Sequence, residues 1–192
     1  MDFSLSEDQR AIADMAGSLF SDSCTDENLI KFDESSETTM KALWQTCLET
    51  GLHALYIPES VGGSGLGITD LMVVLEAQGG ALGQVPLWRH QIAATAIAEF
   101  ASEEQKPLAE QAATGEILLT LSQADSTRSQ GIELFAEKTA SGLVLSGRVE
   151  AVPEAACAKA AVVMVDGPEG VQPVILDLAA SGIRRIDGVF TQ

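Results

Sequence analysis

The residues 56–70, YIPESVGGSGLGITD, place four glycines within six positions, a composition that can hold a phosphate group. The spacing differs from both common phosphate loops. Ile68 stands where a P-loop needs its lysine, and the last three glycines follow G-x-G-x-G instead of G-x-G-x-x-G. Glycines outside these spacings are typical of a tight connection that needs positive φ or a close backbone approach. We therefore predict a connection between two helices here and not a nucleotide site.

Other side chains that could do chemistry are few and scattered. The three cysteines, Cys24, Cys47 and Cys157, form no C-x-x-C pair, so neither a disulfide framework nor a zinc site is expected. His53 and His90 have no nucleophile pattern nearby and are interpreted as surface or core histidines. No metal ligand and no catalytic residue is assigned from these residues.

Glu76 is the one acidic side chain within a largely apolar stretch, LMVVLEAQGG, that follows the glycines. It could act as an acid or a base. Glutamate is, however, usually exposed or packed at the edge of a helix. We interpret Glu76 as a helix-surface or packing carboxylate.

Composition and charge narrow the class of protein. The chain has 192 residues, of which 46% are hydrophobic and 20% charged, a composition typical of globular domains. Its 28 acidic and 11 basic residues give a net charge of -17, which repels nucleic acid and anionic membrane surfaces. The first ten residues are acidic where a signal peptide is basic, and no apolar run is long enough for a membrane span. These features predict a soluble, cytoplasmic protein.

The hydrophobic period changes near Gly115. A capping box at Ser6 and Gln9 opens the first of five or six amphipathic helices within residues 1–115. Short runs rich in Val, Ile and Leu then alternate with turns, as in an antiparallel sheet. We predict an α+β protein: an N-terminal all-α helical bundle over 1–115, followed by an antiparallel β-barrel or sandwich-like domain over 116–192.

The order of these features resembles the acyl-CoA dehydrogenase family. The segment LWQTCLETGLHALYIPESVGGSGLGITDLMVVLEAQG is similar to that family's N-terminal pattern of a helical Trp, a Gly-Leu stop, Pro-Glu, a glycine loop and an Asp-capped helix containing a glutamate. The corresponding residues here are Trp44, Gly51, Leu52, Pro58, Glu59, Gly62, Gly63, Gly65, Asp70 and Glu76. A later segment around Ser146-Gly147 resembles the family's middle β-domain.

The resemblance implies a flavoprotein that binds FAD and oxidises the α,β bond of an acyl-CoA thioester, usually as an oligomer. In that family a third, C-terminal helical domain carries the catalytic glutamate. The sequence ends within or just after the segment that resembles the middle domain, so no residue is assigned as the base.

The family's flavin contacts correspond to Leu121, Ser122, Val152 and Pro153, which the resemblance makes the candidate FAD-binding residues. Two family features differ. Ala151 stands where the family has a tryptophan, and Pro153 has neither a hydroxyl nor an N–H group. Two functions remain open: the N-terminal and middle domains of an acyl-CoA dehydrogenase, or a non-catalytic partner subunit with a degenerate flavin site in a heteromeric enzyme.

Basic side chains that could meet a CoA phosphate are also few. In the second half of the chain the candidates are Arg148 and the pair Arg184 and Arg185. Isolated surface charges usually have no partner, so solvated strand ends are the commoner interpretation.

Overall fold

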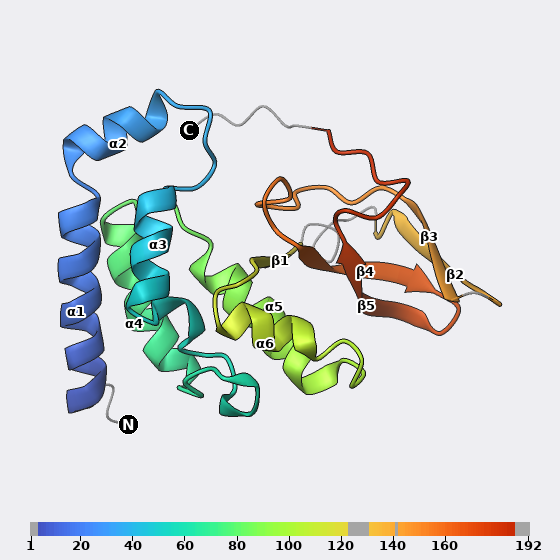
Figure 1. Cartoon of the computed structure of the whole chain (residues 1–192), viewed down its shortest axis with the longest axis horizontal. Helices are drawn as coiled ribbons and strands as arrows, with labels where there is room; N and C mark the ends of the chain where they lie inside the picture. Colours follow the sequence, from blue (N-terminus) through green and yellow to red (C-terminus); the bar gives the residue numbers. More distant parts are fainter. Residues whose placement is uncertain (1–3, 123–130, 141, 187–192) are drawn as a thin grey trace. The chain divides into compact units, whose positions relative to one another are not determined.

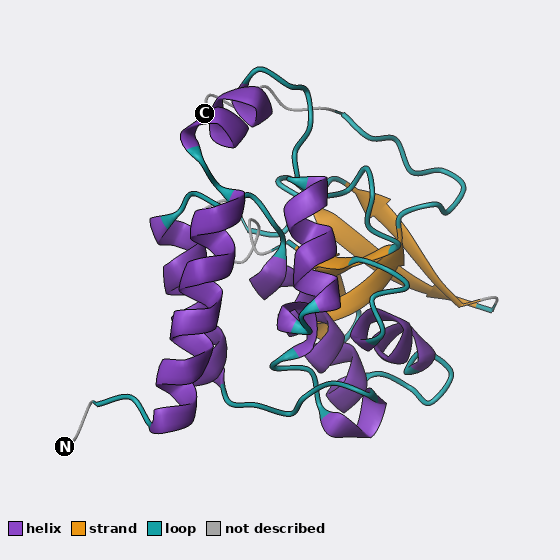
Figure 2. Ribbon diagram, turned by 60° about the vertical axis from the view of Figure 1, so that its left-hand side comes forward, coloured by secondary structure: helices purple, strands orange, loops and turns teal. Residues whose placement is uncertain are grey.

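A computed structural model describes residues 4–122, 131–140 and 142–186. These residues form two compact units, one up to Glu116 and the other from Ile117 onward. The first is helical and the second is built on a sheet, as the colours of Figure 2 show. The predicted α+β class is confirmed.

The first unit contains six α-helices and two short 3-10 helices (Figure 1). They are α1 (Glu7–Ser23), α2 (Asp26–Asp33), α3 (Lys41–Glu49), η1 (Leu52–Ala54), η2 (Glu59–Val61), α4 (Ile68–Gly80), α5 (Leu87–Phe100) and α6 (Pro107–Ala113).

Local sequence signals set the starts of two of these helices. The capping box of α1 is present, because the Ser6 hydroxyl accepts from the Gln9 N–H at 3.1 Å and the Gln9 side chain accepts from the Ser6 N–H. At α4, Asp70, which the family pattern led us to expect as the cap, lies inside the helix. Gly67 is the N-cap instead, and the Asp70 carboxylate accepts from its N–H at 2.8 Å.

The core of the helical unit lies where α1, α3 and α4 meet. Phe20, Cys47 and Val74 are completely buried there, each from a different helix. The buried side chains of Leu52 and Leu87 belong to the same cluster. The periodic apolar faces that predicted these helices are therefore the faces that pack.

The second unit is an open, five-stranded sheet of β1 (Leu119–Leu121), β2 (Leu134–Thr139), β3 (Gly142–Gly147), β4 (Ala160–Gly167) and β5 (Gly170–Asp177). β4 pairs antiparallel with β5 across a turn at Gly167–Gly170, and β2 pairs antiparallel with β3. β4 also runs parallel to β1 and to β2.

The expected purely antiparallel sheet is thus corrected to a mixed one, and the described strands do not close into a barrel. Parallel neighbours need a long crossover, and the β2–β3 hairpin lies within the connection from β1 to β4. The hydrophobic period of a short strand is the same for both directions of pairing, which is why the sequence did not distinguish them.

None of the helices in the described part of the chain combines the length and the hydrophobicity that a membrane crossing needs.

Candidate functional site

The glycine-rich connection is closed on itself. Gly62 and Gly65 have φ of 92° and 61°, and a Cβ on Gly63 would lie 2.0 Å from the carbonyl oxygen of Ile57. Every backbone N–H of residues 62–66 donates to a carbonyl of the preceding segment. A phosphate cradle needs such N–H groups free and convergent. The connection therefore positions α4, and none of these five N–H groups is left for an anion.

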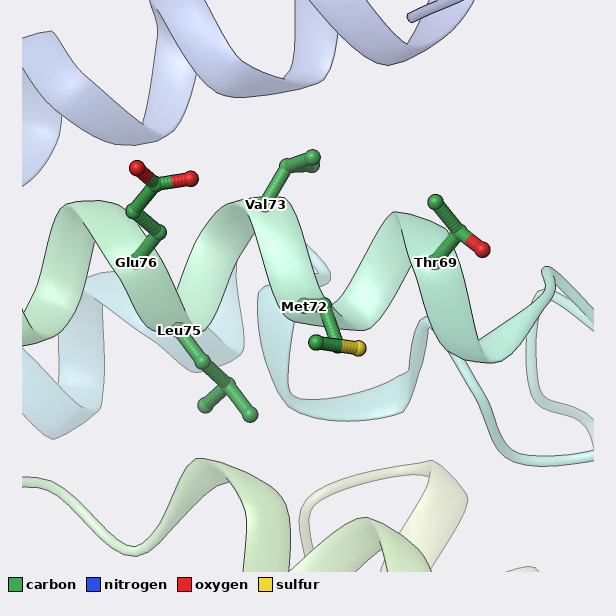
Figure 3. A pocket seen from close by; sticks show the side chains of 5 residues that line it. All are labelled: Thr69, Met72, Val73, Leu75 and Glu76. Carbon is green, nitrogen blue, oxygen red and sulfur yellow. The ribbon is translucent and has the colours of Figure 1, made fainter. Parts of the chain in front are cut away.

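Helix α4 carries an apolar hollow of about 500 Å³ on its surface (Figure 3). It is lined by Thr69, Met72, Val73, Leu75 and Glu76, and the side chain of Met72 is 61% exposed. Glu76 contributes an exposed carboxylate, as predicted for a helix surface. The lining contains no paired acid and base and no nucleophile. It offers a contact surface for an apolar group and no chemistry of its own.

The two histidines are core residues. His53 is 5% exposed, with Nδ1 at 3.3 Å from the carbonyl oxygen of Cys47 and Nε2 at 3.0 Å from that of Ala113. His90 is fully buried, and its Nε2 lies 3.2 Å from the carbonyl oxygen of Ala112. These carbonyls lie in the last turns of α3 and α6, and that of Ala112 also accepts from the Gly115 N–H at 3.0 Å. Both histidines therefore contact helix ends from within the core.

Gln91 on α5 is a buried polar residue that sequence reasoning missed. Its Oε1 accepts from the Tyr56 N–H at 2.8 Å, while its Nε2 donates to the carbonyls of Leu52 and Leu87. It therefore holds both the first residue of η1 and Tyr56, which follows η1. A glutamine in an alanine-rich helix gives no signal of such a role, because the partners lie 35 and 39 residues away.

Two of the three thiols, those of Cys24 and Cys47, are buried and therefore poor nucleophiles. Burial, followed by the neighbouring Cys24, raises the pKa of Cys47 to about 12. Burial also raises the pKa of Cys24. Cys157 is exposed. No group of three or more potential metal-ligating side chains occurs in residues 4–122, 131–140 and 142–186.

The predicted FAD contacts lie in the second unit, where the end of β1 meets the segment 150–154. The Ser122 N–H donates to the carbonyl of Val162 at 3.0 Å, and its hydroxyl donates to the carbonyl of Glu150 at 2.9 Å. Leu121 is 7% exposed, and Val152 packs against the hydrophobic cluster of the sheet. Gln123, where the family has a glutamate, lies outside the described residues.

The segment that contains Val152 and Pro153 is an unusual turn. Ala151 and Glu154 both have positive φ, 49° and 53°, which non-glycine residues rarely adopt. The Glu154 carboxylate accepts from the hydroxyl of the buried Thr120 at 3.4 Å. Neither Thr120 nor Glu154 stood out in the sequence.

These positions fit a flavin ring poorly. Both donors of Ser122 are used within the protein, Pro153 has no donor, and Ala151 offers no aromatic face. Contact of Leu121, Ser122, Val152 and Pro153 with FAD stays a prediction.

Two of the arginines that could meet a phosphate, Arg148 and Arg185, already donate hydrogen bonds within the protein. Arg148 donates to the Glu133 carboxylate at 2.8 and 3.1 Å and lies 3.1 Å from that of Glu150. Arg185 donates to the carbonyl of Leu178. Two carboxylates beside Arg148 oppose the approach of an anion.

An acyl-CoA dehydrogenase-type fold begins with a helical domain and continues with a β-domain. This chain has the same order: a helical unit with its closed glycine connection, then a unit built on a sheet. The family model described as the N-terminal domain of acyl-CoA dehydrogenase matches residues 6–116, more than half of the chain. The chain belongs to the acyl-CoA dehydrogenase family, as the sequence resemblance predicted.

Three similar proteins illustrate the relationship. The acyl-CoA dehydrogenase FadE27 of Mycobacterium tuberculosis is 30% identical over 123 residues, 63% of this chain and 33% of that protein. The crystal structure of the ChsE4-ChsE5 complex from Mycobacterium tuberculosis has a TM-score of 0.88 at 25% identity, covering 96% of this chain and 50% of that one. The Tcur3481-Tcur3483 steroid ACAD G363A variant has a TM-score of 0.82 at 31% identity, covering 92% and 49%.

The chain thus spans about a third of the curated relative and about half of these solved structures. Other structures that share this fold, at less than 25% identity, are complexes with FAD or FADH2.

Proposed function

We propose that the chain is a subunit of a heteromeric acyl-CoA dehydrogenase and supplies its N-terminal helical and middle β domains. The observation that carries the proposal is the match across 96% of the chain to a structure described as a complex of two proteins, ChsE4 and ChsE5. The steroid ACAD is also described by the names of two proteins, Tcur3481 and Tcur3483, and its identity to this chain, 31%, is higher than the 25% of the ChsE4-ChsE5 structure. The proposed reaction of the assembly is α,β-dehydrogenation of an acyl-CoA, with FAD accepting the hydride when it is bound.

The substrate class we propose is a thioester with a bulky apolar acyl group, such as a steroid side chain. The steroid ACAD supports this class. The hollow on α4 supports it from the structure, because its lining is apolar apart from Glu76 and the edge of Thr69. No catalytic base is assigned to this chain. Its proposed role in the assembly is to bind and orient the thioester substrate.

The strong negative charge argues for a partner with a different surface. At a net charge of -17, two copies of this chain repel each other more strongly than this chain repels a less acidic subunit. A homo-oligomer is the competing arrangement. Location in the cytoplasm belongs to the same proposal.

Co-expression with each acyl-CoA dehydrogenase chain of the source organism tests the assembly. Native mass spectrometry should detect one species that contains both chains and FAD, and that species should reduce an artificial electron acceptor with a steroid-type acyl-CoA. A chain that stays separate from every such partner, or forms only copies of itself, would contradict the heteromeric function.

A further inference from the structure

The turn of residues 150–154 is held by side chains of β1. The Ser122 hydroxyl donates to the carbonyl of Glu150 at 2.9 Å, and the Thr120 hydroxyl donates to the Glu154 carboxylate at 3.4 Å. Ser122 is 7% exposed and Thr120 is fully buried. Both bonds therefore form where water competes little, and breaking either would leave a buried polar group unpaired.

The same turn stores backbone strain at two positions. The positive φ of Ala151 and of Glu154 is unfavourable for non-glycine residues, so the surrounding contacts must hold the turn in place. The Ser122 and Thr120 bonds reach its first and last residues, and Val152 between them packs into the sheet cluster. The turn is fixed at both ends and in the middle.

The geometry points to a structural latch at the position where the family binds the flavin ring. The sequence resemblance assigns Ser122 to FAD. Its hydroxyl instead donates to the carbonyl of Glu150 and so holds the turn. This inference rests on the proposed function and refines it: both donors of Ser122 are used within the protein and Pro153 has none, so neither residue donates a hydrogen bond to the ring of FAD.

Hydrogen exchange of the 192-residue chain tests the latch, because two backbone amides report on the turn. The N–H groups of Cys157 and Ala158 both donate to the carbonyl of Glu154, at 2.9 and 2.8 Å. Ser122→Ala should speed their exchange roughly fivefold, as expected for the loss of one hydrogen bond. Ser146→Ala, at an exposed serine on β3, is the matched control and should leave it unchanged.

FAD itself is the probe for the competing role. Added in molar excess, FAD should leave exchange of these two amides unchanged in the wild-type chain. Wild-type exchange rates in Ser122→Ala would overturn the latch. Protection of the turn by FAD, weakened in Ser122→Ala, would overturn it as well and restore Ser122 as a flavin contact.

A second variant covers the case in which Ser122→Ala does not fold. Glu154→Ala removes the acceptor of Thr120 but keeps the backbone groups that report, and it should speed exchange in the same direction. Glu154→Gln keeps an acceptor oxygen and should change it less. Equal exchange in both variants and the wild type contradicts the latch. The proposed function fails separately, through the absence of a heteromeric species, whatever these exchange rates show.

Discussion

The Nε2 atom of His53 lies 3.0 Å from the carbonyl oxygen of Ala113, sixty residues further along the chain. This contact joins η1, which follows α3, to the last residue of α6. The neighbouring His90 reaches the carbonyl of Ala112 in the same turn. The two imidazoles therefore contact carbonyls in the last turn of α6 within the buried core, and the Ala112 carbonyl also accepts from the Gly115 N–H.

His53→Ala should lower the free energy of unfolding of the helical unit by about 2–4 kcal/mol, since it leaves a cavity and removes the imidazole from the buried carbonyl of Ala113. Urea unfolding followed by far-UV circular dichroism measures the loss. Gln45→Ala, which removes an exposed contact with Glu49, should change stability by less than about 0.5 kcal/mol and is the control. Equal stabilities of the two variants would show that His53 is not a structural cap.

Gly63→Ala and Gly79→Ala should have opposite effects. The new methyl group on Gly63 would lie 2.0 Å from the Ile57 carbonyl oxygen, so the connection must shift and stability should fall by about 2 kcal/mol or more. At Gly79, inside α4, nothing lies within 4 Å, and alanine should raise stability by about 0.5–1 kcal/mol. Thermal unfolding compares them. A harmless alanine at Gly63 would contradict the close approach described here.

The sequence predicted the local features of the fold and missed the long-range ones. The capping box at Ser6 and the glycine connection depend on neighbours a few residues away, so spacing alone indicates them. The parallel pairing of β1 with β4 and the role of Gln91 depend on residues tens of positions apart. Period and propensity contain no information about such partners.

The same distinction applies to the candidate site. Ser122 was found only because a family motif places a hydroxyl there, and the motif says nothing about what that hydroxyl contacts. Its acceptor, the carbonyl of Glu150, lies 28 residues away. The positive φ of Ala151 and Glu154 was equally invisible, because neither residue type favours that conformation.

The Cys47 thiol should make the stability of the helical unit fall with rising pH. Burial raises its folded pKa from 9.0 to about 12, so the folded protein keeps a proton that the unfolded chain loses above pH 9. The stabilisation is complete below pH 9 and is lost as the pH rises toward 12. The difference in unfolding free energy between wild type and Cys47→Ala should therefore narrow from pH 8 to pH 10.5, measured in urea. A difference that is constant or widens contradicts the raised pKa.

Alkylation distinguishes the cysteines without unfolding the protein. Iodoacetamide at pH 8 should modify the exposed Cys157 and leave Cys47, whose thiol is both buried and protonated. Peptide mass spectrometry locates the modified residue. Modification of Cys47 as fast as that of Cys157 would mean that α3 opens readily, against the packing seen around it.

Met72→Glu tests the hollow on α4 as the seat of an apolar acyl group. Met72 is 61% exposed, so the substitution should change the free energy of unfolding by less than about 0.5 kcal/mol. A carboxylate at this point would have to lose water when an apolar group binds, and it would add a second negative charge beside Glu76. The affinity of the heteromeric assembly for a steroid-type acyl-CoA, measured by calorimetry, should fall at least about tenfold, a change of about 1.4 kcal/mol.

Met15→Glu is the control for Met72→Glu. It places the same charge on α1, at a methionine that is 42% exposed and does not line the hollow, and it should bind like the wild type. If Met72→Glu also binds like the wild type, the acyl group lies elsewhere; if both variants weaken binding equally, the effect is one of overall charge.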